Sequence, residues 1–206
     1  KKKAIILSIK GYDLTLKEQK LIVNEKPWGL ILFKRNIKSL RQLIELIKKI
    51  RKSTKDPKFP IMIDEEGASV SRLSKIIKHN FSQKLVGDIY KNNPKIALII
   101  YKNYINKLTN LLKKIGININ TVPVLDVTRE KTHKIIGNRS FSNDPKVVKE
   151  LGKICVKQYK LKKVGTVIKH IPGHGCSSLD THLKTPKVKL NYKNLNKIDF
   201  FPFKSN

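Results

Sequence analysis

The most constraining feature of this sequence is a series of short apolar runs separated by longer amphipathic segments. The runs occupy residues 4–9, 28–33, 59–64, 119–127 and 164–170. Each is largely a continuous apolar stretch, as is typical of a strand that is covered on both faces in a parallel sheet. The segments between the runs are long enough to contain helices. The sequence therefore predicts an α/β fold in which helices connect parallel strands.

Amphipathic periodicity predicts two helices in the first quarter of the chain, at residues 14–25 and 39–52. Ser39 and Gln42 form a capping-box pattern at the start of the second segment. Its predicted buried face consists of Leu40, Leu43, Ile44, Ile47 and Ile50. Both segments follow an apolar run directly, so they are expected to cross back over the sheet.

Start and stop signals predict two further helices. The Asn93-Pro94 dipeptide opens a long helix that Gly116 ends, since Asn is a favoured cap and Pro is tolerated at the first helical position. Another helix starts at Asp144-Pro145 by the same rule. The side of that helix predicted to be apolar consists of Val148, Leu151, Cys155 and Tyr159.

Polar residues at the ends of the predicted strands favour one α/β architecture over another. Asp64 and Asp126 each end a strand. Lys169 and His170 end a later strand, and Arg139 lies in a loop between. In a (β/α)8 TIM barrel all such ends converge on one site, whereas a doubly wound sheet gathers ligand groups only near its switch point. The pattern favours the barrel.

Five strands are fewer than a barrel needs. A typical barrel takes about 250 residues, and this chain has 206. We expect residues 1–206 to be the N-terminal portion of a single TIM-barrel domain, with about the first five strands present and the last strands absent. Missing strands expose sheet edges, so we expect the isolated chain to be poorly stable.

The formal net charge of +30 raises the question of an anionic partner. Dense lysine attracts phosphate, yet the lysines are spread along the whole chain rather than gathered in one stripe. Arginine is scarce and aromatic residues make up 7%, so the side chains that read or stack on bases are poorly supplied. We interpret the charge as a compositional bias and predict no specific nucleic-acid partner.

Cysteine usage and hydropathy bear on the location of the protein. Only Cys155 and Cys176 occur, which suits a reducing compartment, and we predict the cytoplasm. No apolar run approaches the roughly 20 residues that span a bilayer, and we predict no membrane partner. The basic start of the chain is followed by an apolar stretch too short for a signal peptide.

Two loops contain residues suited to ligand binding. In residues 64–73, Asp64 and Arg72 can reach one polar ligand together, or they form a salt bridge in a surface turn. In residues 136–145, Arg139 lies between apolar neighbours and can present its planar guanidinium to hydroxyls or a carboxylate, or it pairs locally. Carboxylates at strand ends are common, so neither loop alone decides between these alternatives.

The stretch 169–182 gathers three histidines and an aspartate. A metal site would combine the histidines with Cys176 or Asp180, but proline and glycine prevent the helix that gives His-x-x-x-His its zinc geometry. An acid/base pair is a second interpretation, because Asp180 and His182 lie two apart and project to one side of an extended loop. The third is a solvated polar loop. All three remain open on this evidence.

Taken in order, the motifs of the chain resemble one family. The segments "GLILFKRNI", "IDEEGASVSRL", "VPVLDV", "IIGNRSF" and "KHIPGHG" with "DTH" are similar to those of bacterial β-N-acetylhexosaminidases of glycoside hydrolase family three. The resemblance covers nearly the whole chain and implies a (β/α)8 barrel. It also implies removal of terminal β-linked N-acetylglucosamine, from muropeptides in cell-wall recycling, by an enzyme without a metal or other cofactor that is monomeric at full length.

The resemblance carries residue roles to this chain by position. The residues matching those that bind the terminal sugar are Asp64, Arg72, Arg139, Lys169 and His170. His182 matches the catalytic acid/base, and Asp180 the carboxylate that supports it. The implied chemistry is retaining hydrolysis through a covalent glycosyl-enzyme. The chain departs from the family pattern at Ala68 and Ser69, and at Cys176, where the family generally has an aspartate.

The family also implies a group that this chain lacks. Its aspartate nucleophile lies on a loop after a later strand, beyond the segment similar to "FFPFKSN", and no acid here matches it. We therefore expect the full-length parent to be active and this chain alone to be inactive. The alternative is a fragment or remnant that binds sugar without hydrolysing it.

Overall fold

The computed structural model describes residues 1–179, 185 and 187–205. Its centre is a sheet of five parallel strands: β1 (Lys3–Leu7), β2 (Pro27–Leu32), β3 (Ile61–Ile63), β6 (Ile119–Asn120) and β7 (Gly165–Thr166). They lie side by side in the order β1-β2-β3-β6-β7, which is their order in the chain. The sheet thus has no reversal of strand order. The predicted α/β fold with a parallel sheet is confirmed.

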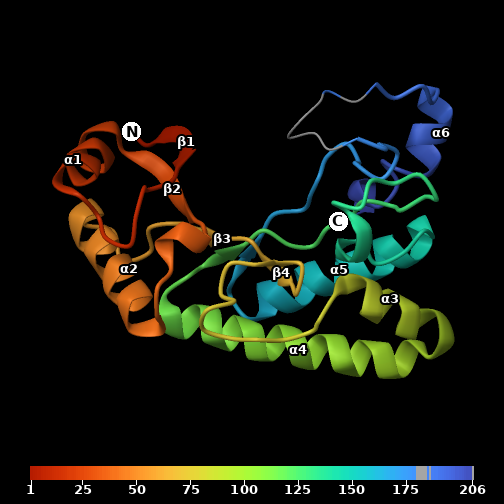
Figure 1. The fold of residues 1–206 in the computed structure, drawn as a ribbon, viewed down its shortest axis with the longest axis horizontal. Coiled ribbons are helices and arrows are strands. Elements are labelled where there is room, and N and C mark those ends of the chain that lie inside the picture. The colour runs from red at the N-terminus through yellow and green to blue at the C-terminus, as the bar shows by residue number, and fades with distance from the viewer. Residues whose placement is uncertain (180–184, 186, 206) are drawn as a thin grey trace.

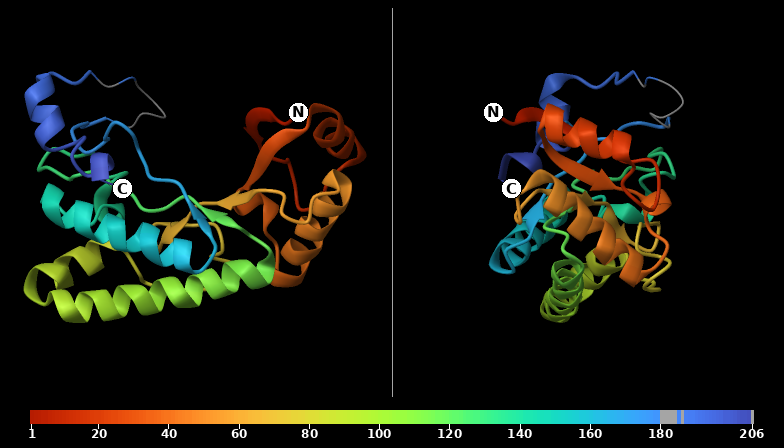
Figure 2. Two further views of the ribbon diagram at one scale, coloured as in Figure 1. Left: turned by 180° about the vertical axis from the view of Figure 1, so that it is seen from behind. Right: turned by 90° about the vertical axis from the view of Figure 1, so that its left-hand side faces the viewer.

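Helices connect the strands and cover the sheet (Figure 1). The α-helices are α1 (Leu16–Glu25), α2 (Leu40–Thr54), α3 (Gln83–Asn92), α4 (Pro94–Ile115), α5 (Pro145–Leu161) and α6 (Tyr192–Lys197). Three short 3-10 helices are η1 (Lys34–Asn36), η2 (Gly137–Arg139) and η3 (Phe203–Ser205). The long α4 runs along one side of the molecule beneath α3 and α5, while α1 and α2 lie with β1 and β2 at the far end (Figures 1 and 2).

The capping signals of the sequence are used largely as predicted. The Asn93 side chain accepts a hydrogen bond from the Ile96 amide at 3.1 Å, and Gly116 ends α4 in the left-handed conformation at φ 101°. Ser39 accepts from the Gln42 amide at 3.2 Å. The Gln42 side chain, however, does not return to Ser39. It accepts from the Lys38 amide and donates to two carbonyls, so only half of the predicted capping box forms.

The apolar face of each helix forms the core. All four apolar residues predicted on α5 are buried. On α2 the prediction is partly wrong, because Leu40 is 41% exposed and Leu46 is buried. Leu40 is the first residue of α2, so the turn that would cover its side chain is missing.

Three parts of the chain differ from the pattern read in the sequence. The predicted strand 119–127 is regular only at β6, because Pro123 lacks an amide hydrogen. Its continuation meets the next strand through the bridge between Val124 and Lys169. A small antiparallel hairpin, β4 (Glu65–Gly67) with β5 (Val70–Ser71), was not predicted. Helix α3 was also missed, since its sequence is short and mixed in polarity.

None of the helices in the described part of the chain has the length and apolar character that a bilayer crossing needs. Cys155 and Cys176 are both free cysteines. Burial raises the pKa of the Cys155 thiol to about 12, which makes that residue part of the core rather than a reactive group.

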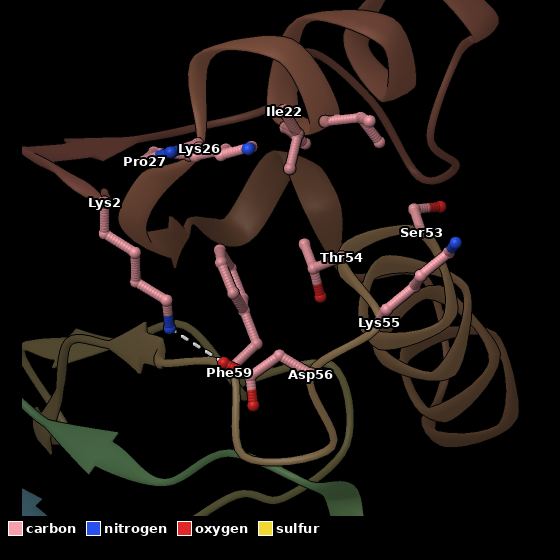
Figure 3. Close-up of a pocket in the computed structure, with 10 residues that line it drawn as sticks. Lys2, Ile22, Lys26, Pro27, Ser53, Thr54, Lys55, Asp56 and Phe59 are labelled. Carbon is pink, nitrogen blue, oxygen red and sulfur yellow. Dashed lines mark hydrogen bonds and ion pairs between the residues drawn. The ribbon is translucent and has the colours of Figure 1, made fainter.

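A pocket of about 380 Å³ lies at the end of the sheet where the strands begin (Figure 3). Its apolar lining includes the buried residues Ile22, Pro27 and Phe59. Lys2 reaches across to Asp56, with 2.8 Å between Nζ and Oδ2. This amino-end pocket is distinct from the polar cleft at the opposite end.

Candidate functional site

A cleft of about 470 Å³ lies at the carboxyl ends of the strands. Its lining residues are Phe33, Asp64, Glu66, Val70, Arg72, Ile135, Ile136, Arg139, Lys169, His170 and His174. They follow β2, β3, β6 and β7 or lie in the β4–β5 hairpin, so several strand ends contribute to one site. All five residues predicted to bind a ligand line this cleft.

Asp64 stands at the centre of the first group of contacts. Its carboxylate accepts from Arg72 Nη2 at 3.0 Å, from Lys169 Nζ at 3.2 Å and from the Thr121 hydroxyl. Burial raises the pKa of Asp64, but the charge of Lys169 and the hydrogen bonds from Thr121 and Arg72 outweigh it and lower the pKa to about 2. Asp64 is therefore an anion throughout the physiological range.

Glu66, a nearly buried residue of the cleft lining, is the centre of a second group of contacts. Arg139 binds it with two nitrogens, Nε to Oε2 at 2.7 Å and Nη2 to Oε1 at 3.0 Å. Lys169 Nζ lies 2.5 Å from Glu66 Oε1. Only 2% of the Glu66 side chain is exposed. The planar guanidinium fits a carboxylate in this two-bonded way, so Glu66 fixes where both cations stand.

Lys169 has no donor left for a ligand in this arrangement. Its ammonium carries three hydrogens, and three acceptors surround it: Asp64, Glu66 and the Thr121 hydroxyl at 2.9 Å. The lysine therefore acts on a ligand through the charge and position it gives to Asp64. Side chains with free surface in the cleft are Arg72, of which 29% is exposed, and His170, of which 36% is exposed.

His170 is held on both ring nitrogens. Nδ1 lies 2.6 Å from Asp126 Oδ2, and Nε2 lies 3.1 Å from Arg139 Nη2. A guanidinium can only donate, so Nε2 is the acceptor and the ring proton lies on Nδ1, directed at Asp126. The buried Asp126 also accepts from the His174 amide at 2.6 Å. Asp126 thereby fixes the orientation of the imidazole.

The other wall of the cleft is apolar. Phe33, Val70, Ile135 and Ile136 line it. The guanidinium carbons of Arg35 and Arg72 lie 4.7 Å and 5.6 Å from the centre of the Phe33 ring. The cleft therefore offers polar groups on one side and apolar contacts on the other, as small-molecule sites do.

The structural alternatives from the sequence can now be assessed. The ion-pair partner of Arg139 is not local, since Glu66 is 73 residues away in the chain, although Arg139 Nη1 also donates to the nearby Ile135 carbonyl at 3.0 Å. Asp64 and Arg72 do form a salt bridge, but it lines the cleft instead of a surface turn. Asp180 and His182, predicted as the acid/base pair, lie outside the described residues. The metal interpretation also draws on them. Among described residues no three His, Cys, Asp or Glu side chains form a metal-binding group.

Sequence reasoning missed several residues of the site. Glu66 was treated only as part of a motif, and Asp126 only as a marker of a strand end. Thr121 was not considered. A signal was present, because two acids in a row after a buried strand seldom both face water. Thr121 and Asp126 likewise interrupt a largely apolar run. Nothing local indicated which cation each acid would bind.

Fold and cleft together define an α/β protein whose ligand site is built from strand ends, lined by paired charges, and suited to a hydroxyl-rich small molecule. Residues 5–206 match the model of the glycosyl hydrolase family 3 N terminal domain. The chain therefore belongs to glycosyl hydrolase family 3.

Similar proteins carry glycosidase names. A β-hexosaminidase of Nitrosomonas eutropha is 32% identical over 200 residues, covering 97% of this chain and 57% of that protein. A β-hexosaminidase of Stenotrophomonas maltophilia is 28% identical over 201 residues, covering 98% and 59%. The crystal structure of NagZ from Neisseria gonorrhoeae in complex with N-trifluoroacetyl-D-glucosamine has a TM-score of 0.88 and 28% identity, covering 98% and 59%. The chain thus spans just over half the length of these relatives.

Proposed function

We propose that this chain contributes the sugar-binding part of a β-N-acetylglucosaminidase. The observation that carries the proposal is the convergence of Asp64, Arg72 and His170 on one cleft, each held in place by a hydrogen-bonded partner. A sugar presents vicinal hydroxyls that both donate and accept. Arg72, Lys169 and Thr121 occupy three of the roughly four acceptor sites of the ionised Asp64 carboxylate, so it can accept one such hydrogen, while Arg72 donates from its planar fork.

The apolar wall fits the remaining part of this substrate. An N-acetyl group adds a methyl to a polar ring, and the wall of Phe33, Val70, Ile135 and Ile136 offers apolar contacts beside the charged side. The gonococcal relative was solved with a glucosamine that carries an N-acyl group, which supports this choice of ligand class. The substrate we propose is a saccharide ending in β-linked N-acetylglucosamine, and a muropeptide of the cell wall is its natural source.

For the chemistry, we propose that His182 acts as acid and base, supported by Asp180, in a retaining mechanism. An imidazole titrates near neutral pH and can donate a proton to the leaving oxygen, then remove one from water. A retaining reaction also needs a carboxylate nucleophile close to the anomeric carbon. Asp64 and Glu66 are each bound by two cationic side chains, so we propose neither of them as the nucleophile.

The remaining parts of the proposal concern architecture and setting. The sequential order of the five strands and the exposed apolar residues Ile5 and Ile6 on edge strand β1 support a sheet that continues into a (β/α)8 barrel. We propose a cytoplasmic location and a monomeric enzyme. No cofactor enters the proposed reaction, because proton transfer and a carboxylate nucleophile suffice for glycoside hydrolysis.

Binding tests the sugar site directly. Titration calorimetry of N-acetylglucosamine into the chain should show one site, and Arg72→Ala should weaken binding by about 10- to 150-fold, since a hydrogen bond to a charged group contributes about 1.5–3 kcal/mol. Arg41→Ala, which removes an exposed arginine on α2, is the matched control and should change nothing. Absence of any binding by the unaltered chain would refute the proposal.

Catalysis is tested on the polypeptide as its gene encodes it. Release of nitrophenol from a nitrophenyl N-acetyl-β-glucosaminide should fall by about 10²–10⁴ in His182→Ala, which is the usual contribution of a general acid/base. Sugar affinity should be kept in that variant. Unchanged turnover would show that His182 has been given the wrong role, and binding without turnover in the parent would indicate a sugar-binding remnant.

A further inference from the structure

Helix α3 begins where the Asp126 strand, the Arg139 loop and the β4–β5 hairpin meet. Gln83, its first residue, is buried with 2% of its surface exposed. Its side-chain Nε2 donates to the Val124 carbonyl at 2.9 Å and to the Arg139 carbonyl at 2.7 Å. Its Oε1 accepts from the Val124 amide at 3.2 Å. One amide group thus joins the strand and the loop by three hydrogen bonds.

These bonds fix the two segments that hold His170. Val124 lies two residues before Asp126, which binds Nδ1 of the imidazole, and Arg139 binds Nε2. Val124 also forms the bridge to Lys169, and the next amide, Leu125, donates to the Lys169 carbonyl at 2.7 Å. Gln83 therefore helps to set the distance between the two partners of His170, together with the Ser140 hydroxyl, which donates to the Asp126 carbonyl at 2.5 Å.

Two close backbone approaches keep α3 in this place. A Cβ on Gly87, one helical turn after Gln83, would lie 1.8 Å from the Phe141 carbonyl oxygen, so only glycine fits there. On the other side, the Ala68 amide of the hairpin donates to the Phe81 carbonyl at 2.8 Å. That contact holds the hairpin carrying Glu66 against the residues just before α3.

We propose that Gln83 is a positioning residue for the sugar site, which it serves by holding the Asp126 strand and the Arg139 loop at the spacing that His170 requires. It touches no ligand. Its consequence for affinity rests on the proposed sugar-binding function, whereas its consequence for the geometry of His170 and Arg139 does not.

The test is the chain carrying Gln83→Met, which keeps the length of the side chain and removes all three hydrogen bonds. In ¹⁵N-labelled protein, the Arg139 Nε–H and His170 Nδ1–H resonances should shift or broaden, because their partners lose a fixed spacing. Affinity for N-acetylglucosamine should fall by about tenfold, as expected for the loss of a buried hydrogen-bond clamp. Gln83→Glu keeps only the acceptor and should give the same changes.

The matched control is Gln42→Met. Gln42 is also an amide that binds two backbone carbonyls, those of Tyr12 and Asn36, but it holds the loops after β1 and β2. Its loss should lower the melting temperature while both resonances and the affinity stay as in the unaltered chain. If Gln83 had only a structural role, Gln83→Met would likewise lower the melting temperature and leave both resonances and the affinity unchanged. That result would overturn the proposal.

Two further outcomes keep the inference separate from the proposed function. If the unaltered chain does not bind the sugar, the proposed function fails, but the two resonances still report on Gln83. If Gln83→Met does not fold, hydrogen exchange in the unaltered chain replaces it. Slow exchange of the Gln83 side-chain amide and the Val124 amide supports the clamp, and fast exchange of both overturns it.

Discussion

At the carboxyl end of the sheet, Asp64 and Glu66 are each bound by two cationic side chains. At the amino end, by contrast, Lys26 and Lys55 line a pocket, and neither makes an ion pair within the described part of the chain. Both regions draw on the same lysine-rich composition. At one end the paired acids are largely buried, while at the other Lys26 and Lys55 are exposed and the Lys2–Asp56 pair lies at the surface.

The comparison extends to the other acids of the chain. The buried carboxylates of the described residues are Glu65, Glu66, Asp126 and Asp199. Each is bound by a basic side chain. Arg129 forms an ion pair with Asp199, while His79 lies within hydrogen-bonding distance of Glu65 and His170 hydrogen-bonds Asp126. A net charge of +30 therefore says little about function by itself. Burial and pairing distinguish the charges that shape the cleft from the exposed lysines that keep the surface hydrated.

The strongest way to break this comparison is Glu66→Ala. Removing one partner of a buried ion network leaves Arg139 without a counter-charge and Lys169 with Asp64 alone, and this should destabilise the fold by about 3–5 kcal/mol. Urea unfolding measures the difference. Asp88→Ala, which breaks the exposed pair with Lys84 at 2.8 Å, should cost less than about 1 kcal/mol. Equal costs for the two variants would contradict the distinction between the cleft and the surface.

A second prediction uses the pKa of Asp64, which is lowered to about 2 from an ordinary value of 3.8. A carboxyl group whose pKa is lower in the folded state stabilises the fold above the unfolded pKa. That contribution is lost as the pH falls from about 4 to 2. Allowing for partial exposure, it amounts to roughly 1–2 kcal/mol.

Asp64→Asn provides the measurement. It should be less stable than the unaltered chain at pH 6, and the difference should shrink toward zero near pH 2. The exposed Asp13, which pairs with Lys49 at 2.7 Å, is the control. Asp13→Asn should show a much smaller difference at every pH. A gap for Asp64→Asn that persists undiminished at pH 2 would mean that shape, not charge, accounts for it.

Much of this fold was predictable from the sequence, and the reasons are local. Continuous apolar runs located all five strands, and Asn93, Gly116 and Asp144 marked helix ends because capping depends on neighbouring residues only. The five residues that the family resemblance predicted to bind a ligand do line one cleft. Helix α3 and the hairpin were missed. In α3, Gln83 binds the Arg139 carbonyl and Gly87 packs against the Phe141 carbonyl, and both partners lie more than fifty residues away in the chain.

A third prediction sharpens the comparison at the amino end, where backbone shape counts for more than charge. Lys55 ends α2 in the left-handed conformation at φ 52°, which is costly for a residue with a side chain. Lys55→Gly should stabilise the fold by about 0.5–1 kcal/mol. Thermal unfolding measures the gain. Lys55→Ala removes the same charge but keeps Cβ, so a gain with Ala as large as with Gly would refute the backbone explanation.

The smallest expected effect is that of removing a charge from the amino-end pocket. Lys26→Gln keeps most of the side chain and neutralises an ammonium that makes no ion pair with any described residue. Unfolding free energy should change by less than about 0.5 kcal/mol, and N-acetylglucosamine affinity should be unchanged. A loss of affinity would mean that the two ends of the sheet are coupled, contrary to the separation argued above.

The order of the strands in the sheet has a consequence for biosynthesis. Each strand pairs with the one made just before it, so the sheet can assemble in step with translation. The ion pairs of the cleft cannot form in step with translation. Arg139 is made 73 residues after Glu66, and Lys169 is made 105 residues after Asp64. Until β7 has left the ribosome, the nascent chain therefore carries acidic groups whose burial has to wait. The charged residues of the cleft begin with Asp64 after the third strand, but their ion pairs are complete only when Lys169, after the fifth, has been made.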